Sequence, residues 1–221
     1  MIDERFRLVG KPKTFMRLVQ TFQLSKKRVL DIGCGFGEYL AHFGPGSVGL
    51  TTTPAEKEAA AQRGLSVTLG NAEEIHTLNL GSFDVIWANN LFEHLLSPHA
   101  FLMHLRSVSL AGTTLILGVP VVPRPKWLLI FLRFRGSLAS NHINFFTRDS
   151  LILTVARAGW TVRAARPFIF GSPFLDALTY WVAPHMYVVA EYNPDFSYPD
   201  KKVKEWKDEP YYQELLNSTN V

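Results

Sequence analysis

One segment of the chain, Val29-Leu30-Asp31-Ile32-Gly33-Cys34-Gly35-Phe36-Gly37, has the residue types and spacing of a ligand-binding turn. An apolar run ends in an acidic residue, and glycines then follow at alternate positions before an amphipathic stretch. Glycine lets a ligand approach where a Cβ would collide, and a strand, a glycine turn and a helix start are typical of a nucleotide-type cofactor site. A dinucleotide site would need its third glycine where Glu38 stands. A chance glycine turn in an α/β protein is the alternative.

The composition indicates one globular domain. The chain has 221 residues, 47% of them hydrophobic, which is enough to bury one substantial core. It has no apolar run near the ~18 residues of a membrane span, and its first residues lack a signal peptide's apolar stretch. The single cysteine, Cys34, excludes an internal disulfide, and no His, Cys and Asp residues cluster in sequence at metal-ligand spacing, so we expect no metal. We expect a cytoplasmic protein.

Strand-like and helix-like segments alternate along the chain. The pattern predicts helices over 12–24, 38–43, 54 onward, 147–158 and from the fourth strand to about 109, with strands over 29–31, 47–50, 66–69, 83–87, 113–119, 161–165 and 186–192. This alternation favours a doubly wound, mostly parallel seven-stranded sheet of the Rossmann-like α/β class. Ligands bind such sheets beyond the carboxyl ends of the strands, which places the turn after Asp31 at the site. Residues 1–193 form the predicted domain and 194–221 a loosely ordered or partner-bound tail.

Further motifs in the same order strengthen one interpretation of the glycine turn. They are Gly70-Asn71-Ala72-Glu73, Phe83-Asp84-Val85-Ile86, Asn89 to Leu95, Ser109-Leu110-Ala111-Gly112-Thr113, and His142 to Thr147 with Ala158-Gly159-Trp160. Together with the glycine turn they resemble class I, seven-strand S-adenosylmethionine (SAM)-dependent methyltransferases, in the ubiquinone-biosynthesis-like branch. The similarity covers about residues 28–192. It implies a SAM-dependent methyltransferase fold and SAM as the cofactor.

The resemblance also implies which residues bind the cofactor. The glycines would let the backbone pass under the methionine and ribose, and Asp31 would meet the cofactor's ammonium group or hydrogen-bond the glycine turn itself. Asn71 and Ala72 would bind adenine, although Asn71 is also a plausible plain turn residue. Cys34 is expected only to fit the turn. The full expected set is Asp31, Gly33, Cys34, Gly35, Gly37, Thr51, Thr52, Glu56, Asn71, Ala72, Glu73, Asn89 and Leu91.

The second strand departs from the common family pattern. Most relatives end it with a carboxylate that holds both ribose hydroxyls, whereas this chain has Thr51 there. Gly49-Leu50-Thr51 resembles the sterol and cyclopropane-fatty-acid methyltransferase branch, in which a residue of the next helix takes that role. The matching residue here is Glu56, so we expect it to replace the missing carboxylate. The alternative is an ordinary acidic residue near a helix N-terminus.

Two histidines are the catalytic candidates. Family geometry would place His94 near the methyl group, where an imidazole could take a proton from an acceptor hydroxyl. His142, which begins the motif His142 to Thr147, would approach the same place and could act in the same role. Each could instead serve only in packing.

Residues 121–146 would form a substrate-side insertion. Its segment 121–136 is almost wholly apolar from Trp127 to Phe134 and is flanked by Arg124, Lys126, Arg133 and Arg135. This composition predicts a cationic, aromatic helix at a membrane interface, a wall of a pocket for a hydrophobic acceptor, or a core helix with a basic rim. Residues 1–30 carry eight Lys and Arg against two acidic residues, and 121–168 carry eight against Asp149 alone.

The predicted function is methyl transfer to a small-molecule acceptor, hydrophobic or lipid-linked, with O-methylation favoured. Peripheral contact with an anionic membrane is a further expectation. The alternative is a non-catalytic SAM-binding regulatory or scaffolding protein. Nucleic acid is not an expected partner, because no DNA- or RNA-binding motif accompanies the sequence pI of about 9.2.

Overall fold

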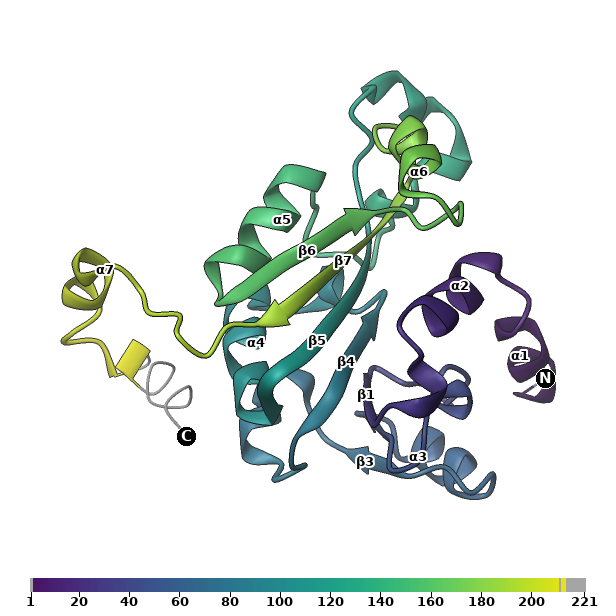
Figure 1. The fold of residues 1–221 in the computed structure, drawn as a ribbon, viewed down its shortest axis with the longest axis horizontal. Helices are drawn as coiled ribbons and strands as arrows, with labels where there is room; N and C mark the ends of the chain where they lie inside the picture. The colour runs from purple at the N-terminus through teal and green to yellow at the C-terminus, as the bar shows by residue number, and fades with distance from the viewer. Residues whose placement is uncertain (1, 211, 214–221) are drawn as a thin grey trace.

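A seven-stranded sheet forms the centre of the computed structural model, which describes residues 2–210, 212 and 213 (Figure 1). The strand order is β3-β2-β1-β4-β5-β7-β6, and β7 is antiparallel to both of its neighbours. The strands are β1 (Val29–Ile32), β2 (Val48–Thr51), β3 (Val67–Leu69), β4 (Phe83–Asn89), β5 (Ser109–Pro120), β6 (Trp160–Arg166) and β7 (His185–Tyr192). The predicted fold class is therefore confirmed, and the order reverses between β1 and β4, beside the glycine turn.

Apolar side chains pack on both faces of this sheet. Along β4, Val85 and Trp87 face one core cluster with Phe15 and Leu18, whereas Ile86 belongs to the other. This alternation follows from the two-residue period of a strand. The second cluster is closed by α4 (Pro98–His104) and α5 (Arg148–Arg157), and the first by α2 (Lys13–Thr21). The central strands are thus buried on both sides, as parallel sheets require.

Local sequence signals set several helix boundaries. Pro54 occupies the first position of α3 (Pro54–Ala61), where its missing N–H costs no hydrogen bond. Thr147 caps α5 through a reciprocal hydrogen-bond pair with Ser150. Gly159 ends that helix region with a φ of +88°, a conformation that favours glycine.

The expected helix over 38–43 is reduced to a single 3₁₀ turn, η2 (Leu40–His42). The chain cannot continue as a helix because Pro45 disfavours helical backbone at the residue before it. That residue, Gly44, lies directly against the backbone of Lys27, where an added Cβ would be 2.6 Å from the Lys27 nitrogen.

The insertion also differs from the expected helix. It contains three short turns, η6 (Lys126–Ile130), η7 (Leu132–Phe134) and η8 (Gly136–Leu138). Pro123 and Pro125 lack the N–H groups that a helix would need, and Gly136 is a poor helix former. Three further helices were not predicted from sequence: α1 (Ile2–Val9), α6 (Pro173–Thr179) and α7 (Asp200–Glu205).

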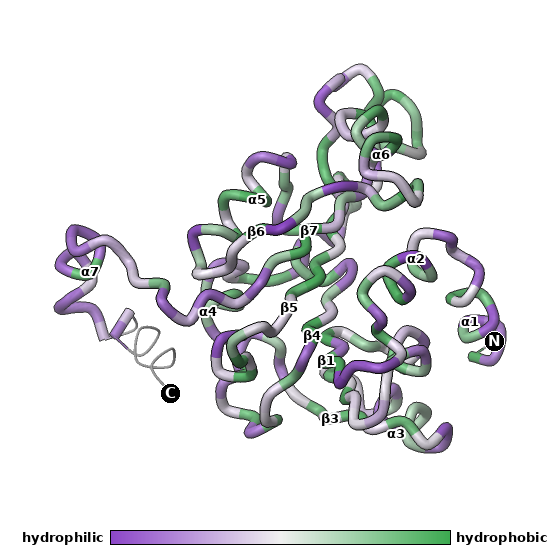
Figure 2. Tube along the Cα trace, in the orientation of Figure 1, coloured by the Kyte–Doolittle hydropathy of each residue, from purple (hydrophilic) through white to green (hydrophobic). Residues whose placement is uncertain are grey.

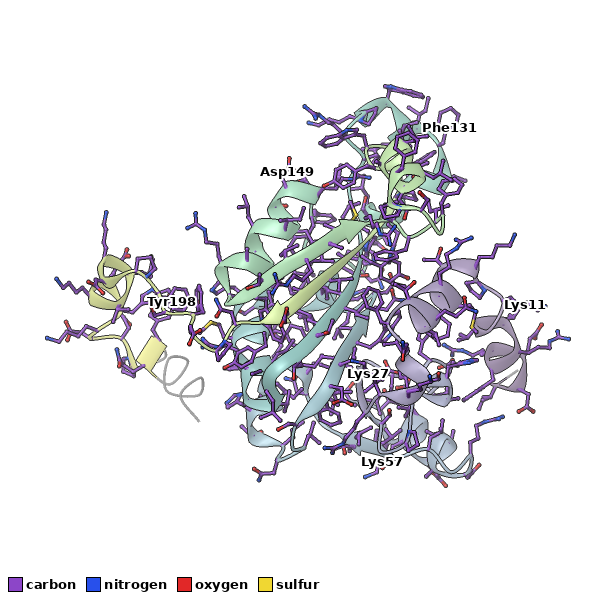
Figure 3. The ribbon with its side chains drawn as sticks, viewed as in Figure 1. Lys11, Lys27, Lys57, Phe131, Asp149 and Tyr198 are labelled. Carbon is purple, nitrogen blue, oxygen red and sulfur yellow. The ribbon has the colours of Figure 1, made fainter. Side chains whose placement is uncertain are left out.

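The described part of the predicted tail contacts the domain. Phe196 packs against Gly159, and the Arg106 guanidinium lies 5.7 Å from the ring centroids of Tyr192 and Phe196. The Tyr198 hydroxyl lies 2.5 Å from His99 Nε2 on α4, and Figure 3 shows Tyr198 between the end of β7 and α7. Residues 211 and 214–221 of the predicted tail lie outside the described residues. None of the described helices has the length and hydropathy needed to cross a bilayer.

Candidate functional site

The glycine turn after β1 is built from left-handed backbone. The φ angles are +73° at Gly33, +55° at Gly35 and +88° at Gly37, a region that L side chains rarely adopt. The N–H groups of Gly33 and Cys34 both donate to the Leu50 carbonyl of β2, at 2.9 and 3.0 Å. The turn is therefore fixed to the neighbouring strand, and the glycines are needed for its shape.

A pocket of about 280 Å³ opens beside this turn. Its lining combines the turn, the end of β2, the start of α3, the segment after β3 and the segment after β4: Gly33, Gly35, Leu50, Thr51, Thr52, Thr53, Glu56, Gly70, Ala72 and Leu91. The structure thus brings together expected cofactor residues from five separate segments. Leu50, Thr53 and Gly70 were missed by the sequence reasoning, although Gly70 heads a motif quoted there.

Glu56 reaches back from the first turn of α3 to the end of β2. Its Oε2 accepts a hydrogen bond from the Thr51 hydroxyl at 2.5 Å, and both residues line the pocket. The carboxylate thus stands beside the position where a strand-end acid was expected. A carboxylate there can accept hydrogen bonds from a pair of vicinal hydroxyls.

Asp31 is buried beneath the turn, with 1% of its surface exposed. Burial and the nearby Glu38 carboxylate raise its pKa from 3.8 to about 8, while a hydrogen bond from the Leu40 N–H acts in the opposite direction. Its Oδ2 has no hydrogen-bond partner among the described residues. A buried acceptor of this kind suits a cationic ligand group, which would satisfy the oxygen and return the carboxyl to its charged form.

The other expected cofactor residues lie around the pocket rather than in its lining. The Asn71 side chain accepts from the Glu73 N–H at 3.1 Å, which is a turn-capping role, and Glu73 accepts from the N–H groups of Leu96 and Ser97. Asn89 Nδ2 lies 3.4 Å from the Tyr39 hydroxyl. Gly37 packs against Leu65.

Cys34 is buried against Gly49, and burial raises the pKa of its thiol well above the usual range. The thiol therefore stays protonated and serves as a small packing group.

His94 and His142, far apart in sequence, meet beside Glu93. The two rings pack edge to face with centroids 4.7 Å apart, and each Nε2 lies 3.9 Å from Glu93 Oε1. Glu93 is 1% exposed, and burial raises its pKa while the two imidazoles act in the opposite direction. The Glu93 carbonyl accepts hydrogen bonds from the N–H groups of Ile143 and Asn144, which joins the segment after β4 to the motif that begins at His142. The sequence reasoning assigned Glu93 no role.

The cluster lies close to the cofactor pocket along the chain. Leu91 lines that pocket, and the His94 N–H donates to the Leu91 carbonyl at 2.9 Å. A larger pocket of about 350 Å³ lies between the segments 72–81 and 107–108 and is lined by His76, Asn79 and Ser107, among others. It contains none of the glycine-turn residues or the Glu93 cluster, so we place the chemistry at the glycine turn.

The fold and this site define a class I, SAM-dependent methyltransferase. A methyltransferase-domain family model matches residues 3–165, and the chain belongs to that family.

Solved structures share the fold at low sequence identity. A TehB-like SAM-dependent methyltransferase from Corynebacterium glutamicum is 16% identical, with a TM-score of 0.61 over 87% of this chain and 96% of that one. A possible histamine N-methyltransferase from Thermotoga maritima is 20% identical, with a TM-score of 0.60 over 86% and 94%. The [4+2]-cyclase SpnF is 16% identical, with a TM-score of 0.59 over 81% and 79%. A search of curated proteins finds no significant match.

The residues present fit SAM. The glycine turn leaves room that side chains would fill, Asp31 offers an unpartnered buried oxygen for an ammonium group, and the Thr51–Glu56 pair offers acceptors for ribose hydroxyls. When bound, SAM supplies an electrophilic methyl group on a cationic sulfonium. The contribution of the protein is to hold that group and an acceptor in line and to exclude water from between them.

Proposed function

We propose that this methyltransferase acts on a hydrophobic acceptor presented at an anionic surface, with an oxygen as the favoured methyl acceptor. The observation that carries the proposal is an exposed apolar cap at the carboxyl edge of the sheet. We define the apolar cap as the exposed apolar side chains of the insertion and of the α6 region: Trp127, Ile130, Phe131, Leu132, Leu138, Phe174, Leu175, Leu178, Trp181 and Val182. A contiguous exposed surface of this kind is typical of a membrane or ligand contact.

The two halves of the apolar cap come from distant parts of the chain and touch each other. The Arg124 N–H donates to the Trp181 carbonyl at 3.1 Å, and the Arg124 guanidinium lies 4.4 Å from the Trp181 ring centroid. Figure 2 shows the insertion and α6 together as mainly hydrophobic segments at one end of the molecule, and Figure 3 shows Phe131 there. Leu132 is 82% exposed and Phe174 73% exposed. Such exposure is costly in water, which favours a partner that covers it.

Part of the positive charge of residues 121–168 is already engaged in contacts within the protein. Arg148 is buried and donates to the carbonyls of Val122 and Ala183, while Arg163 and Arg166 form ion pairs with Glu191 and Asp176. In the insertion, Arg124, Lys126 and Arg135 remain exposed, and Arg133 adds a fourth positive charge by sequence.

The basic residues of segment 1–30 do not all lie at the same edge of the sheet. Lys26, Lys27 and Arg28 precede β1 and so lie at the amino edge, away from the cofactor pocket. The free positive charge at the edge of the sheet that carries the glycine turn is therefore smaller than the basic composition of residues 1–30 and 121–168 suggests. It is concentrated beside the apolar cap.

The position of the apolar cap supports an acceptor role. The insertion follows β5 and α6 follows β6, and both strands run parallel to β1, so these segments leave the sheet at the same edge as the glycine turn. His185, which begins β7, lies 3.0 Å from Asn90 Oδ1 just before Leu91. An acceptor held under the apolar cap would approach the methyl group past His94 and His142, either of which could take the hydroxyl proton.

The test is sedimentation with vesicles of graded anionic lipid content. We expect the native chain to bind, and its binding to weaken as salt is added. The variant Trp127→Ser/Leu132→Ser/Phe174→Ser should lose binding. In a variant with Arg124, Lys126, Arg133 and Arg135 changed to Gln, binding should depend less on salt than in the native chain. The matched control, Leu110→Ser/Leu153→Ser, removes exposed apolar side chains outside the apolar cap and should bind as the native chain does. Equal and negligible binding by all four proteins, together with salt-independent turnover, would contradict the proposal.

A further inference from the structure

We propose that Glu93, His94 and His142 form a site for a divalent transition-metal ion of the Zn²⁺ type. One ligand atom from each residue lies within 4.8 Å of the other two. Two imidazole nitrogens and one carboxylate oxygen are a donor set that suits Zn²⁺ and related ions. The sequence alone predicted no metal because His142 is distant in the chain and joins the other two only through folding.

The distances between the ligand atoms are longer than in an occupied site, and binding of an ion would draw the three side chains together. Each imidazole Nε2 lies 3.9 Å from Glu93 Oε1. Ligand atoms bound tetrahedrally to Zn²⁺ lie about 3.4 Å from one another. The two pairs from Glu93 would therefore need to shorten by about 0.5 Å, and the widest pair of ligand atoms, up to 4.8 Å apart, by about 1.4 Å, which rotation of the side chains can supply.

The hydrogen bonds at the far side of each ring prepare the required tautomer. His94 Nδ1 lies 3.1 Å from the Asn141 carbonyl oxygen, and His142 Nδ1 lies 3.5 Å from that of Ser137. A carbonyl only accepts, so each Nδ1 carries the proton and donates, which leaves each Nε2 lone pair free toward Glu93. Orientation of metal-binding histidines by backbone carbonyls is a common arrangement.

Glu93 provides the independent sign of a missing partner. Its side chain is 1% exposed, and neither carboxylate oxygen has a hydrogen-bond partner among the described residues. A buried carboxylate without a partner is costly, and a cation between it and the imidazoles removes that cost. The His94 side chain is 33% exposed, so one side of the site stays open, as in metal sites that bind a substrate or water.

An ion at this place would lie close to the cofactor pocket, because Leu91 lines that pocket and its carbonyl accepts a hydrogen bond from the His94 N–H. It would bind an acceptor oxygen and lower the pKa of its hydroxyl, so the proton would pass to water and the imidazoles would hold the ion instead of acting as bases. That catalytic role rests on the proposed function, whereas metal binding does not. We therefore measure metal uptake without SAM or acceptor, so a failure of either proposal is recognised separately.

The experiment is equilibrium dialysis of the chelator-treated full chain against Zn²⁺, with Co²⁺ absorption as a second readout of coordination. We expect one ion per chain in the native protein and in the control His42→Ala, whose imidazole lies outside the cluster. Glu93→Gln, which keeps the shape of the side chain, and His142→Ala should each weaken binding at least about 100-fold. A thermal melt of each variant checks that it folds.

Two results would overturn the proposal. One is the absence of stoichiometric Zn²⁺ or Co²⁺ binding by the folded native chain, which would mean that the cluster holds only a shared proton. The other is unchanged affinity in folded Glu93→Gln, which would place the ion elsewhere.

Discussion

The cofactor pocket and the apolar cap lie at the same edge of the sheet but are built differently. The pocket is built from strand ends and tight turns held by backbone hydrogen bonds, such as those from Gly33 and Cys34 to Leu50. The apolar cap is built from three 3₁₀ turns and a short helix whose large side chains face solvent. The difference shows that the central sheet fixes the cofactor side, whereas the side proposed for the acceptor is made of segments appended to the sheet.

Substitutions in the cluster of Glu93, His94 and His142 should give the largest change in rate. We expect His94→Ala and His142→Ala to lower the single-turnover rate at saturating SAM by about 10²–10⁴-fold with a modest change in SAM affinity, because the proton acceptor or metal ligand is lost. His42→Ala is the control. Full activity in both variants would mean that the acceptor ionises without help from these residues.

On the cofactor side, Gly35→Val should abolish SAM binding, with a loss of at least about 100-fold in affinity. The substitution adds a side chain to the pocket lining at a φ of +55°, where a Cβ would already stand 3.3 Å from Glu38 Oε2. Isothermal titration measures the loss. Gly64→Ala, at a φ of +73° with open space around it, carries backbone strain alone and should keep normal affinity.

A smaller effect should follow from Glu56→Gln, which replaces the carboxylate beside Thr51. We expect SAM affinity to fall about 10-fold, since a hydrogen bond to a charged group contributes about 1.5–3 kcal/mol. Glu58→Gln, on the same helix but exposed, is the matched control. Equal affinities in the two variants would remove Glu56 from the cofactor site and leave it as a partner of Thr51 only.

The smallest effect concerns the pH dependence of stability. The folded cofactor-free protein raises the pKa of Asp31 to about 8, so it holds this proton more tightly than the unfolded chain does. The resulting stability is complete below about pH 4 and is lost as the pH rises through about 8. Between pH 5.5 and 8.5 the native Tm should fall more steeply than that of Asp31→Asn, by a few degrees. Thermal melts with and without SAM measure this, and parallel curves would contradict it.

Sequence reasoning succeeded where function requires a local pattern. The glycine turn, Pro54 at the start of α3 and the alternation of strands with helices were predicted because each depends on neighbouring residues. The predicted helix over 38–43 was wrong because Pro45 and the close contact of Gly44 with Lys27 end the helical backbone despite the amphipathic pattern. The predicted helix in the insertion was wrong because Pro123 and Pro125 lack the N–H groups that a continuous helix needs.

The amino-acid sequence by itself determined the seven-stranded class, the left-handed turn after Asp31 and the cationic, apolar character of the insertion, because these follow from residue type and short-range spacing. Only the tertiary structure decided that Glu56 bonds to Thr51, that Glu93 meets both His94 and His142, and that α6 joins the insertion in one exposed surface. Those contacts join segments through crossovers and strand pairing. Their geometry depends on packing across the whole sheet, which no local pattern specifies.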